Sequence, residues 1–202
     1  AGRIAASAVT GAMNKGVYSY IKHFAAYDFN GKMVCVWTNE QALREIYLTG
    51  FEIVVKEAHP KTIMTSYNLV NGEYANENRY LLDTVLKKDW DYDGMLVTDW
   101  GGSNDHALGV QRGSTLEMPA PGCDSVRELL AAVKSGKITE ADINARMEEL
   151  LNLIYTTKSA LDAAPKEFDE AAHHALARRA AAESLVLLKN ENDLLPLQPG
   201  TK

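Results

Sequence analysis

Reactive side chains follow short apolar runs at several points of this 202-residue chain. Asp99 comes directly after the run Met95–Thr98 and directly before Trp100. A carboxylate in such a place suits two chemistries. In glycoside hydrolysis it attacks an anomeric carbon, and in metal-assisted hydrolysis it joins a cluster of ligands. Asp99 could equally cap the short helix that is predicted to follow it.

A basic pair ends another run of the same kind. Lys22-His23 follows the β-branched and aromatic run Val17–Ile21. An ammonium and an imidazole at a strand end can donate hydrogen bonds to sugar hydroxyl groups. The alternative is a solvated pair at a strand terminus, which is a common place for charged side chains.

Two aromatic residues and a glutamate lie at further candidate positions. Tyr67, which follows the run Thr62–Ser66, and Trp100 could wall a sugar site or could pack in the core. Glu117 could accept hydrogen bonds from a ligand or serve as a structural carboxylate, and the sequence does not decide between these roles.

No metal or redox site is predicted. His59, His106 and His173-His174 show no metal-ligand spacing and are expected at the surface. Cys35 and Cys123 form no CxxC pair, so lone buried thiols are expected.

Strand-like and helix-like segments alternate along the chain, which predicts βαβ units and a parallel sheet. Either a doubly wound open sheet or a (β/α)8 barrel fits this α/β pattern. No glycine-rich phosphate loop follows a strand, whereas polar residues end every strand, as they do at the mouth of a barrel. Only four strands are predicted, so we expect the C-terminal half of a TIM-like barrel. They are 17–21, 62–66, 95–98 and 114–118.

The predicted half-barrel spans residues 1–156, a linker spans 157–168, and 169–202 begins a second domain. Helices are expected at about 2–14, 39–51, 76–86, 104–111, 125–134, 139–155 and 169–183. The sequence YNLVNGEY is expected to be a loop.

Charge and hydropathy patterns exclude several classes of protein. The net charge is −6 without a basic stripe, so nucleic acid is not an expected partner. No apolar run approaches the roughly 18 residues of a membrane span, so no membrane association is expected. No signal peptide is visible, which slightly favours a cytoplasmic location. Both ends look like cuts within a longer chain.

Several long segments together resemble glycoside hydrolase family 3, the β-glucosidase and β-xylosidase family. They are IKHFAAYD, ALREIYLTGFE, TSYNLVNGEYANENRYLLDTVLKKDWDYDGMLVTDWGG, LEMP and ESLVLLKNENDLLPL, and they cover nearly the whole chain. The resemblance implies a half-barrel followed by the first elements of an α/β sandwich domain. The form KHFAAYD is similar to the glucosidase branch.

The resemblance also implies a role for each candidate residue. Asp99 matches a catalytic nucleophile that forms a covalent glycosyl-enzyme in a retaining, exo-acting mechanism on terminal β-D-glycosidic bonds. Lys22 and His23 match a pair that binds the hydroxyl groups of the terminal sugar, and Tyr67 and Trp100 match residues beside it. Lys32 stands nearest the place of an arginine in many relatives, and lysine lacks the planar fork of arginine.

The remaining expectations follow from what the resemblance leaves outside the chain. The acid/base glutamate would lie beyond Lys202. The fragment alone is therefore expected to be inactive. The expected partner is a β-linked oligosaccharide or glycoside, with no metal or organic cofactor. The alternatives are a carbohydrate-binding or regulatory relative without turnover, and a β-xylosidase or arabinosidase of the same family.

Overall fold

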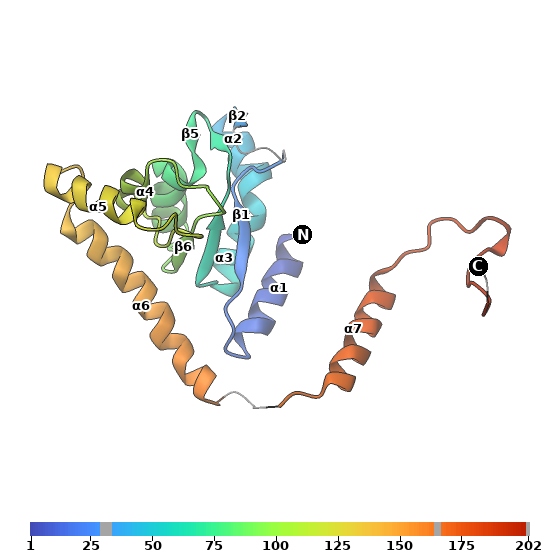
Figure 1. The fold of residues 1–202 in the computed structure, drawn as a ribbon. Coiled ribbons are helices and arrows are strands. Elements are labelled where there is room, and N and C mark those ends of the chain that lie inside the picture. Colours follow the sequence, from blue (N-terminus) through green and yellow to red (C-terminus); the bar gives the residue numbers. More distant parts are fainter. Residues whose placement is uncertain (29–33, 164–166, 201–202) are drawn as a thin grey trace. The chain divides into compact units, whose positions relative to one another are not determined.

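The computed structural model describes residues 1–28, 34–163 and 167–200. The chain forms two compact units, Ala1–Ala163 and Ala164–Lys202, and each is described by itself (Figure 1). Lys32 lies outside the described residues.

A parallel sheet forms the centre of the first unit. Its strands are β1 (Tyr20–Phe24), β3 (Thr62–Thr65) and β6 (Met95–Val97), and they lie in the order β1-β3-β6 (Figure 1). Leu116 adds a parallel bridge to Val97 at the edge of β6. Strand order therefore follows chain order, and the predicted α/β class with a parallel sheet is confirmed.

Two predicted strands differ from the structure. The first begins three residues later than predicted, so Lys22 and His23 lie within β1 and not after it. The regular pairing of β1 with β3 is interrupted at these polar residues by a shift of register and resumes at Phe24.

The fourth predicted strand, 114–118, reduces to the single bridge at Leu116. Pro119 lacks the N–H group that would extend the pairing. The Thr98 hydroxyl holds this segment instead, because it accepts a hydrogen bond from Met118 N at 2.9 Å.

Helices cover the sheet, and polar side chains cap them where the sequence predicts. Asn39 Oδ1 accepts a hydrogen bond from Ala42 N at 2.8 Å, and Thr139 Oγ1 accepts one from Asp142 N at 3.2 Å. The helices of this unit are α1 (Gly2–Met13), α2 (Glu40–Ala42), the π-helix η1 (Leu43–Leu48), α3 (Thr49–Ala58), the 3-10 turn η2 (Ala75–Glu77), the π-helix η3 (Tyr80–Asp89), α4 (His106–Arg112), α5 (Asp124–Ser135) and α6 (Glu140–Ala163).

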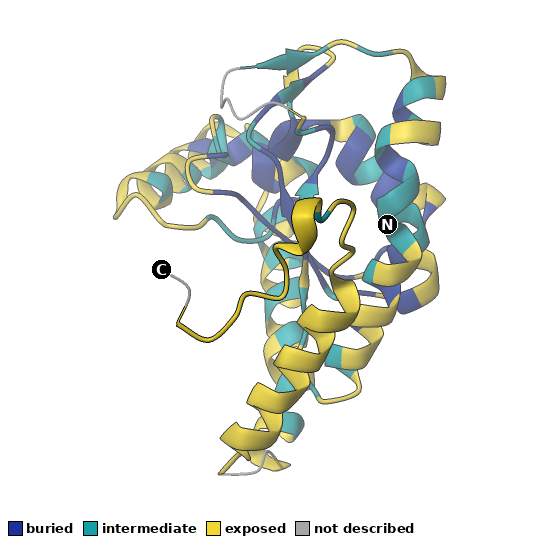
Figure 2. Ribbon diagram, turned by 90° about the vertical axis from the view of Figure 1, so that its right-hand side faces the viewer, coloured by how far each residue is buried: buried dark blue, intermediate teal, exposed yellow. Residues whose placement is uncertain are grey.

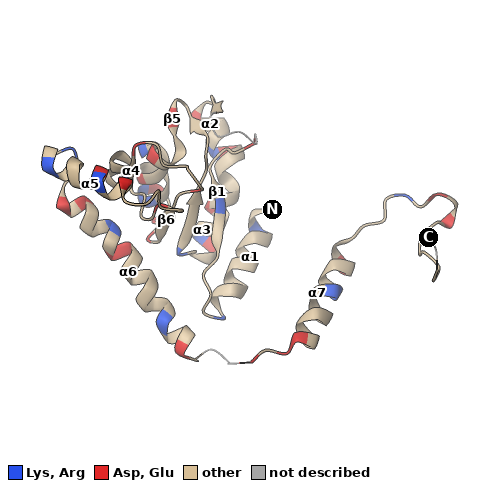
Figure 3. Ribbon diagram, in the orientation of Figure 1, with Lys and Arg blue, Asp and Glu red and all other residues tan. Residues whose placement is uncertain are grey.

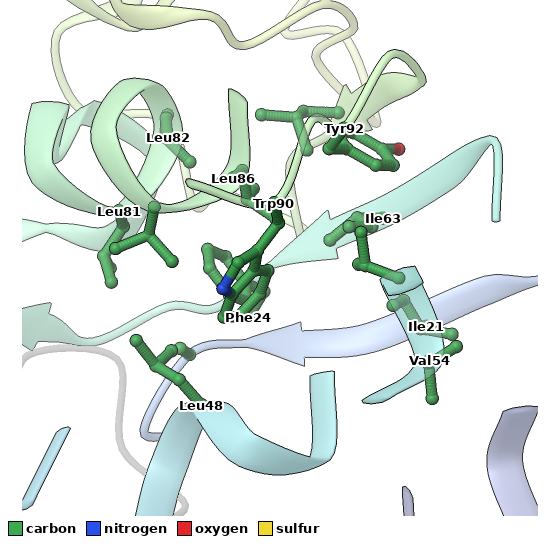
Figure 4. Packing of buried hydrophobic residues seen from close by; sticks show 14 of the residues in the cluster. Ile21, Phe24, Leu48, Val54, Ile63, Leu81, Leu82, Leu86, Trp90 and Tyr92 are labelled. Carbon is green, nitrogen blue, oxygen red and sulfur yellow. The ribbon is translucent and has the colours of Figure 1, made fainter. Parts of the chain in front are cut away.

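The main core lies between the sheet and α1, α3 and η3. Phe24 is fully buried at its centre, with its ring 5.2 Å from that of Phe51 and 6.1 Å from that of Trp90 (Figure 4). Ile63 and Leu96 face the same core from β3 and β6. Burying such large side chains removes apolar surface from water and stabilises the unit.

The other face of the sheet has its own apolar cluster. Met64, Met95 and Val97 pack there against Leu150 and Leu153 of α6. Because successive strand residues point to opposite faces, β3 and β6 are buried on both sides (Figure 2). This explains why their sequences are continuous apolar runs.

A second, small sheet occupies part of the predicted YNLVNGEY loop. Strand β2 (Cys35–Val36) pairs in parallel with β4 (Leu69–Val70), which forms an antiparallel hairpin with β5 (Glu73–Tyr74). Asn71 and Gly72 turn the hairpin with φ values of 52° and 92°. Both angles are positive, as a two-residue type I′ turn requires.

The predicted linker begins later than expected. Helix α6 continues to Ala163, so the linker prediction is wrong for residues 157–163. The described part of the second unit holds α7 (Glu170–Ser184) and a 3-10 turn, η4 (Glu191–Asp193). Its leucines are exposed, including Leu188 at 91% (Figure 2).

The cysteines are not buried as predicted. Cys123 is exposed in the turn that begins α5, and Cys35 is half-buried at the edge of the small sheet. Among the described helices, none is both long enough and apolar enough to cross a membrane.

Candidate active site

The carboxyl ends of β1 and β6 bring His23 and Asp99 together. His23 Nε2 lies 3.2 Å from Asp99 Oδ2, and both side chains are mostly buried, with 28% and 12% of their surfaces exposed. Carboxyl ends of parallel strands meet at one edge of a sheet. The two side chains are therefore in contact although they lie 76 positions apart in the sequence.

The backbone around Asp99 is fixed on both sides. Thr98 N donates to Leu116 O at 3.0 Å, which fixes the residue before it. Gly102 N donates to Asp99 O at 2.7 Å and closes a tight turn after it. The cap of α4 is Asp105, which accepts from Leu108 N at 2.9 Å. The helix-cap alternative for Asp99 is therefore wrong.

Tyr67 joins the same cluster from the end of β3. Burial, together with a hydrogen bond to the Asp99 carboxylate, raises the pKa of the Tyr67 phenol to about 12. A phenol with this pKa remains a hydrogen-bond donor at neutral pH, so it stabilises the negative charge of Asp99. The carboxylate therefore has two hydrogen-bonding neighbours, His23 from β1 and Tyr67 from the segment after β3.

Hydrogen bonds between the ends of β1 and β3 hold this arrangement. Ser66 N donates to Phe24 O at 2.8 Å, and Ser66 Oγ donates to Ala25 O at 3.0 Å. Asn68 Nδ2 donates to Ala26 O at 3.2 Å. Because Tyr67 lies between these two residues, its backbone is fixed on both sides.

The electrostatics of His23 favour a neutral imidazole at pH 7. Burial is the main cause that lowers its pKa below the ordinary 6.5, Asp99 opposes the shift, and Lys22 adds to it. A neutral ring with its proton on Nε2 donates a hydrogen bond to Asp99. The contact thus orients the carboxylate without neutralising its charge.

Lys22 and Trp100 lie at the exposed border of the cluster. Trp100 is 45% exposed directly after Asp99, so it is not a core residue. Lys22 and His23 line a cavity of about 490 Å³ together with Tyr27, Asp28 and other residues. A side chain at each of these positions can reach a ligand that enters from solvent.

The sequence analysis missed two residues of this region. Tyr27 links the cluster, with its ring 5.7 Å from that of His23 and 5.8 Å from that of Tyr67. Its place four residues after His23, beyond a strand end, is the signal that could have found it.

Glu77 is the second residue that was missed. Its buried carboxylate accepts hydrogen bonds from Asn104 N at 2.8 Å and Asp105 N at 2.7 Å. These contacts hold the loop that runs from Asp99 to α4. Burial raises the pKa of Glu77, and the two backbone donors oppose that shift. Nothing in the local sequence points to this role, because the partners lie 27 and 28 residues away.

Glu117 and His106 are neighbours beside this loop. Glu117 accepts a short hydrogen bond from Ser125 Oγ and lies 3.7 Å from His106 Nδ1. The His106 side chain is only 14% exposed, so the prediction that it lies at the surface is wrong. Glu117 therefore has a structural partner within the chain.

The chemistry that these groups can perform is nucleophilic attack by a carboxylate. Asp99 is held by two hydrogen-bonding neighbours, His23 and Tyr67, and Trp100 directly after it is 45% exposed. In the part of the chain that the structure describes, no three His, Cys, Asp or Glu side chains are grouped as metal ligands would be.

Comparison with known proteins identifies the family. The sequence profile of the glycosyl hydrolase family 3 N-terminal domain matches residues 1–153. The chain belongs to glycosyl hydrolase family 3. The match covers all three strands of the main sheet, and Lys22, His23, Tyr67, Asp99 and Trp100 lie within it.

Curated proteins with two kinds of glycosidase name are similar to this chain. It is 46% identical over 199 residues to thermostable β-glucosidase B of Acetivibrio thermocellus, and the match covers 96% of this chain and 26% of that protein. It is 39% identical over 202 residues to an exo-α-(1→6)-L-arabinopyranosidase of Bifidobacterium longum, covering 99% and 26%. The chain thus spans about a quarter of these curated relatives.

Solved family 3 structures share the fold. The GH3 β-glucosidase of Bifidobacterium adolescentis matches with a TM-score of 0.87 and 39% identity, over 98% of this chain and 29% of that one. β-Glucosidase 3B of Thermotoga neapolitana matches with a TM-score of 0.88 and 34% identity, over the same shares of the two chains.

Proposed function

We propose that this chain supplies the nucleophile side of the active site of a retaining, exo-acting β-glycosidase of the β-glucosidase type. The observation that carries the proposal is the position of Asp99, where His23 and Tyr67 meet a carboxylate at the end of β6. The names of the similar β-glucosidases support the substrate class, a terminal β-D-glycoside.

In the proposed reaction, an ionised Asp99 oxygen forms a bond to the anomeric carbon of the sugar. The bond from that carbon to the leaving oxygen breaks, and a carboxylic acid outside this chain protonates the leaving group. That residue, now a base, takes a proton from water, whose oxygen replaces Asp99 on the sugar. Carboxyl groups in retaining enzymes stand about 5–5.5 Å apart, so the second one must approach Asp99 closely.

His23 and Tyr67 have complementary parts in this scheme. Their hydrogen bonds orient the Asp99 carboxylate before the attack. Lys22 and Lys32 are proposed to bind sugar hydroxyl groups, and the indole of Trp100 to pack on the sugar ring. No metal or organic cofactor is required for these steps.

We further infer that the sheet is the second half of a (β/α)8 barrel in the whole protein. The order β1-β3-β6 followed by Leu116 supports this, because barrel strands follow chain order. A doubly wound sheet reverses its order at a switch point. Residues 169–202 are proposed to begin an α/β sandwich domain. The isolated chain is expected to be inactive, because the acid/base residue is proposed to lie outside it.

One similar protein is named an exo-α-(1→6)-L-arabinopyranosidase, so an α-L-arabinopyranoside is a second candidate substrate for the same mechanism. Hydrolysis of aryl β-glucoside, β-xyloside and α-L-arabinopyranoside by the intact protein that carries this chain would separate them. We expect the glucoside to be hydrolysed fastest.

The variant Asp99→Ala should lose at least the roughly 10³-fold that a nucleophile contributes, whereas Asp93→Asn, at an exposed carboxylate, should keep activity. Full activity of Asp99→Ala would contradict the proposal. It would also exclude the alternative of a binding protein without turnover, because such a protein hydrolyses no glycoside.

A further inference from the structure

A basic cavity of about 530 Å³ lies among η3, α4 and α6. None of the residues that line it belongs to the candidate active site. Four of them are cationic, in a chain whose net charge is −6. They are Arg79, Lys87, Arg112 and Arg146. The lysines and arginines of the chain are blue in Figure 3.

Two of these cations share a single carboxylate. Glu149 Oε1 accepts from Lys87 Nζ at 2.8 Å and from Arg146 Nη2 at 2.6 Å, and Glu149 Oε2 accepts from Arg146 Nε at 2.9 Å. Thr115 Oγ1 also donates to Glu149 at 2.5 Å. Two positive charges and one negative charge leave an excess of one positive charge here, on side chains that are 13–27% exposed.

The two acidic side chains that line the cavity are already engaged. Asp83 pairs with Lys88 at 2.8 Å and more distantly with Arg79 at 3.7 Å. Asp142 accepts from the backbone and the hydroxyl of Thr139, and these hydrogen bonds lower its pKa.

The side chain of Arg112 makes no hydrogen bond or ion pair with any other residue that the structure describes. It is half-buried at the end of α4, on the same cavity as Arg146. A guanidinium without a partner, beside a second guanidinium and an ammonium, is the donor set that recognises phosphate and carboxylate.

We propose that this cavity binds a small oxyanion of the phosphate class, with Arg112 as the principal ligand and Arg146 and Lys87 as supporting charges. The cavity is larger than one phosphate ion, so a phosphate group carried by a small molecule also fits. Both ligands present a compact dianionic group, whose negative charge balances the excess positive charge of the cavity.

The test is a titration of the intact protein with inorganic phosphate, followed by calorimetry at low ionic strength. We expect saturable binding in the millimolar range that weakens as chloride is added. The variant Arg112→Gln should weaken it about tenfold or more, the effect of losing one charge-assisted hydrogen bond. A parallel titration with glucose 6-phosphate distinguishes a free ion from a carried phosphate group.

Arg127→Gln is the matched control, because Arg127 is an exposed arginine on α5 that pairs with Asp124 outside the cavity. It should bind phosphate as the unchanged protein does. Equal binding by Arg112→Gln and Arg127→Gln, or no saturable binding by the unchanged protein, would overturn the proposal. If Arg112→Gln lowers the melting temperature, Arg112→Lys provides a second test, because it keeps the charge without the planar fork of arginine and should still bind phosphate more weakly than the unchanged protein. The readout is binding and not hydrolysis, so its failure leaves the proposed catalytic function untouched.

Discussion

Removal of the Glu77 carboxylate should release the loop between Asp99 and α4. The variant Glu77→Ala deletes two hydrogen bonds, to Asn104 N at 2.8 Å and Asp105 N at 2.7 Å. Hydrogen bonds to charged groups contribute about 1.5–3 kcal/mol each. The burial that raises the Glu77 pKa offsets part of this sum, and exposed Asn104 can bond to water instead. We therefore expect a net loss of about 2 kcal/mol.

Hydrogen exchange measured by mass spectrometry on peptides covering residues 99–106 reports this loss directly. A loss of about 2 kcal/mol corresponds to exchange roughly 30-fold faster in this segment. Glu77→Gln retains an acceptor oxygen without a buried charge, so its exchange should change little. Glu57→Ala, at an exposed glutamate on α3, is the control. Equal exchange in Glu77→Ala and Glu57→Ala, or faster exchange across the whole first unit, would refute the local clamp.

Three further outcomes follow from the structure. Because the folded-state pKa of His23 lies below 6.5, stability should fall as the pH drops from about 6.5 through that lowered value, and His23→Gln should flatten this dependence in thermal melts. Gly94→Ala places a Cβ atom 2.5 Å from Lys61 O and from the Tyr92 hydroxyl, so soluble expression should collapse, whereas Gly11→Ala, at an open position, should be tolerated. Leu86→Ala, in the fully buried core, should lower the unfolding free energy by about 3–5 kcal/mol, which denaturant titration would show, and a change below 1 kcal/mol would contradict the described packing.

The sequence predicts strands well where burial is uniform and less well where function interrupts it. β3 and β6 are buried on both faces, so their apolar runs mark them almost to the residue. Lys22 and His23 lie within β1, and their polar side chains lead the sequence pattern to end the strand at Ile21. Asn71-Gly72 is a recognisable hairpin signal that a general loop assignment overlooked.

The candidate site also contains residues that the sequence predicts and residues that it does not. Asp99, His23 and Tyr67 could be predicted because each ends or follows a strand of a parallel sheet, and the topology brings such positions together. Glu77 could not, because its partners are backbone N–H groups, which carry no signature in the sequence. The sequence also predicts too short an α6, because the Thr156–Ala163 segment mixes good helix formers with weaker ones such as threonine and aspartate and has no strong apolar periodicity.

The central claim is that Asp99 is the residue that bonds to the sugar. Incubation of the intact protein with a 2-fluoro β-glucosyl donor carrying a good leaving group, followed by peptide mass mapping, tests it directly. The account predicts one added fluoroglucosyl group on the peptide that contains Asp99, and no label in Asp99→Asn. A label on a different carboxylate, or turnover without any covalent adduct, would contradict it.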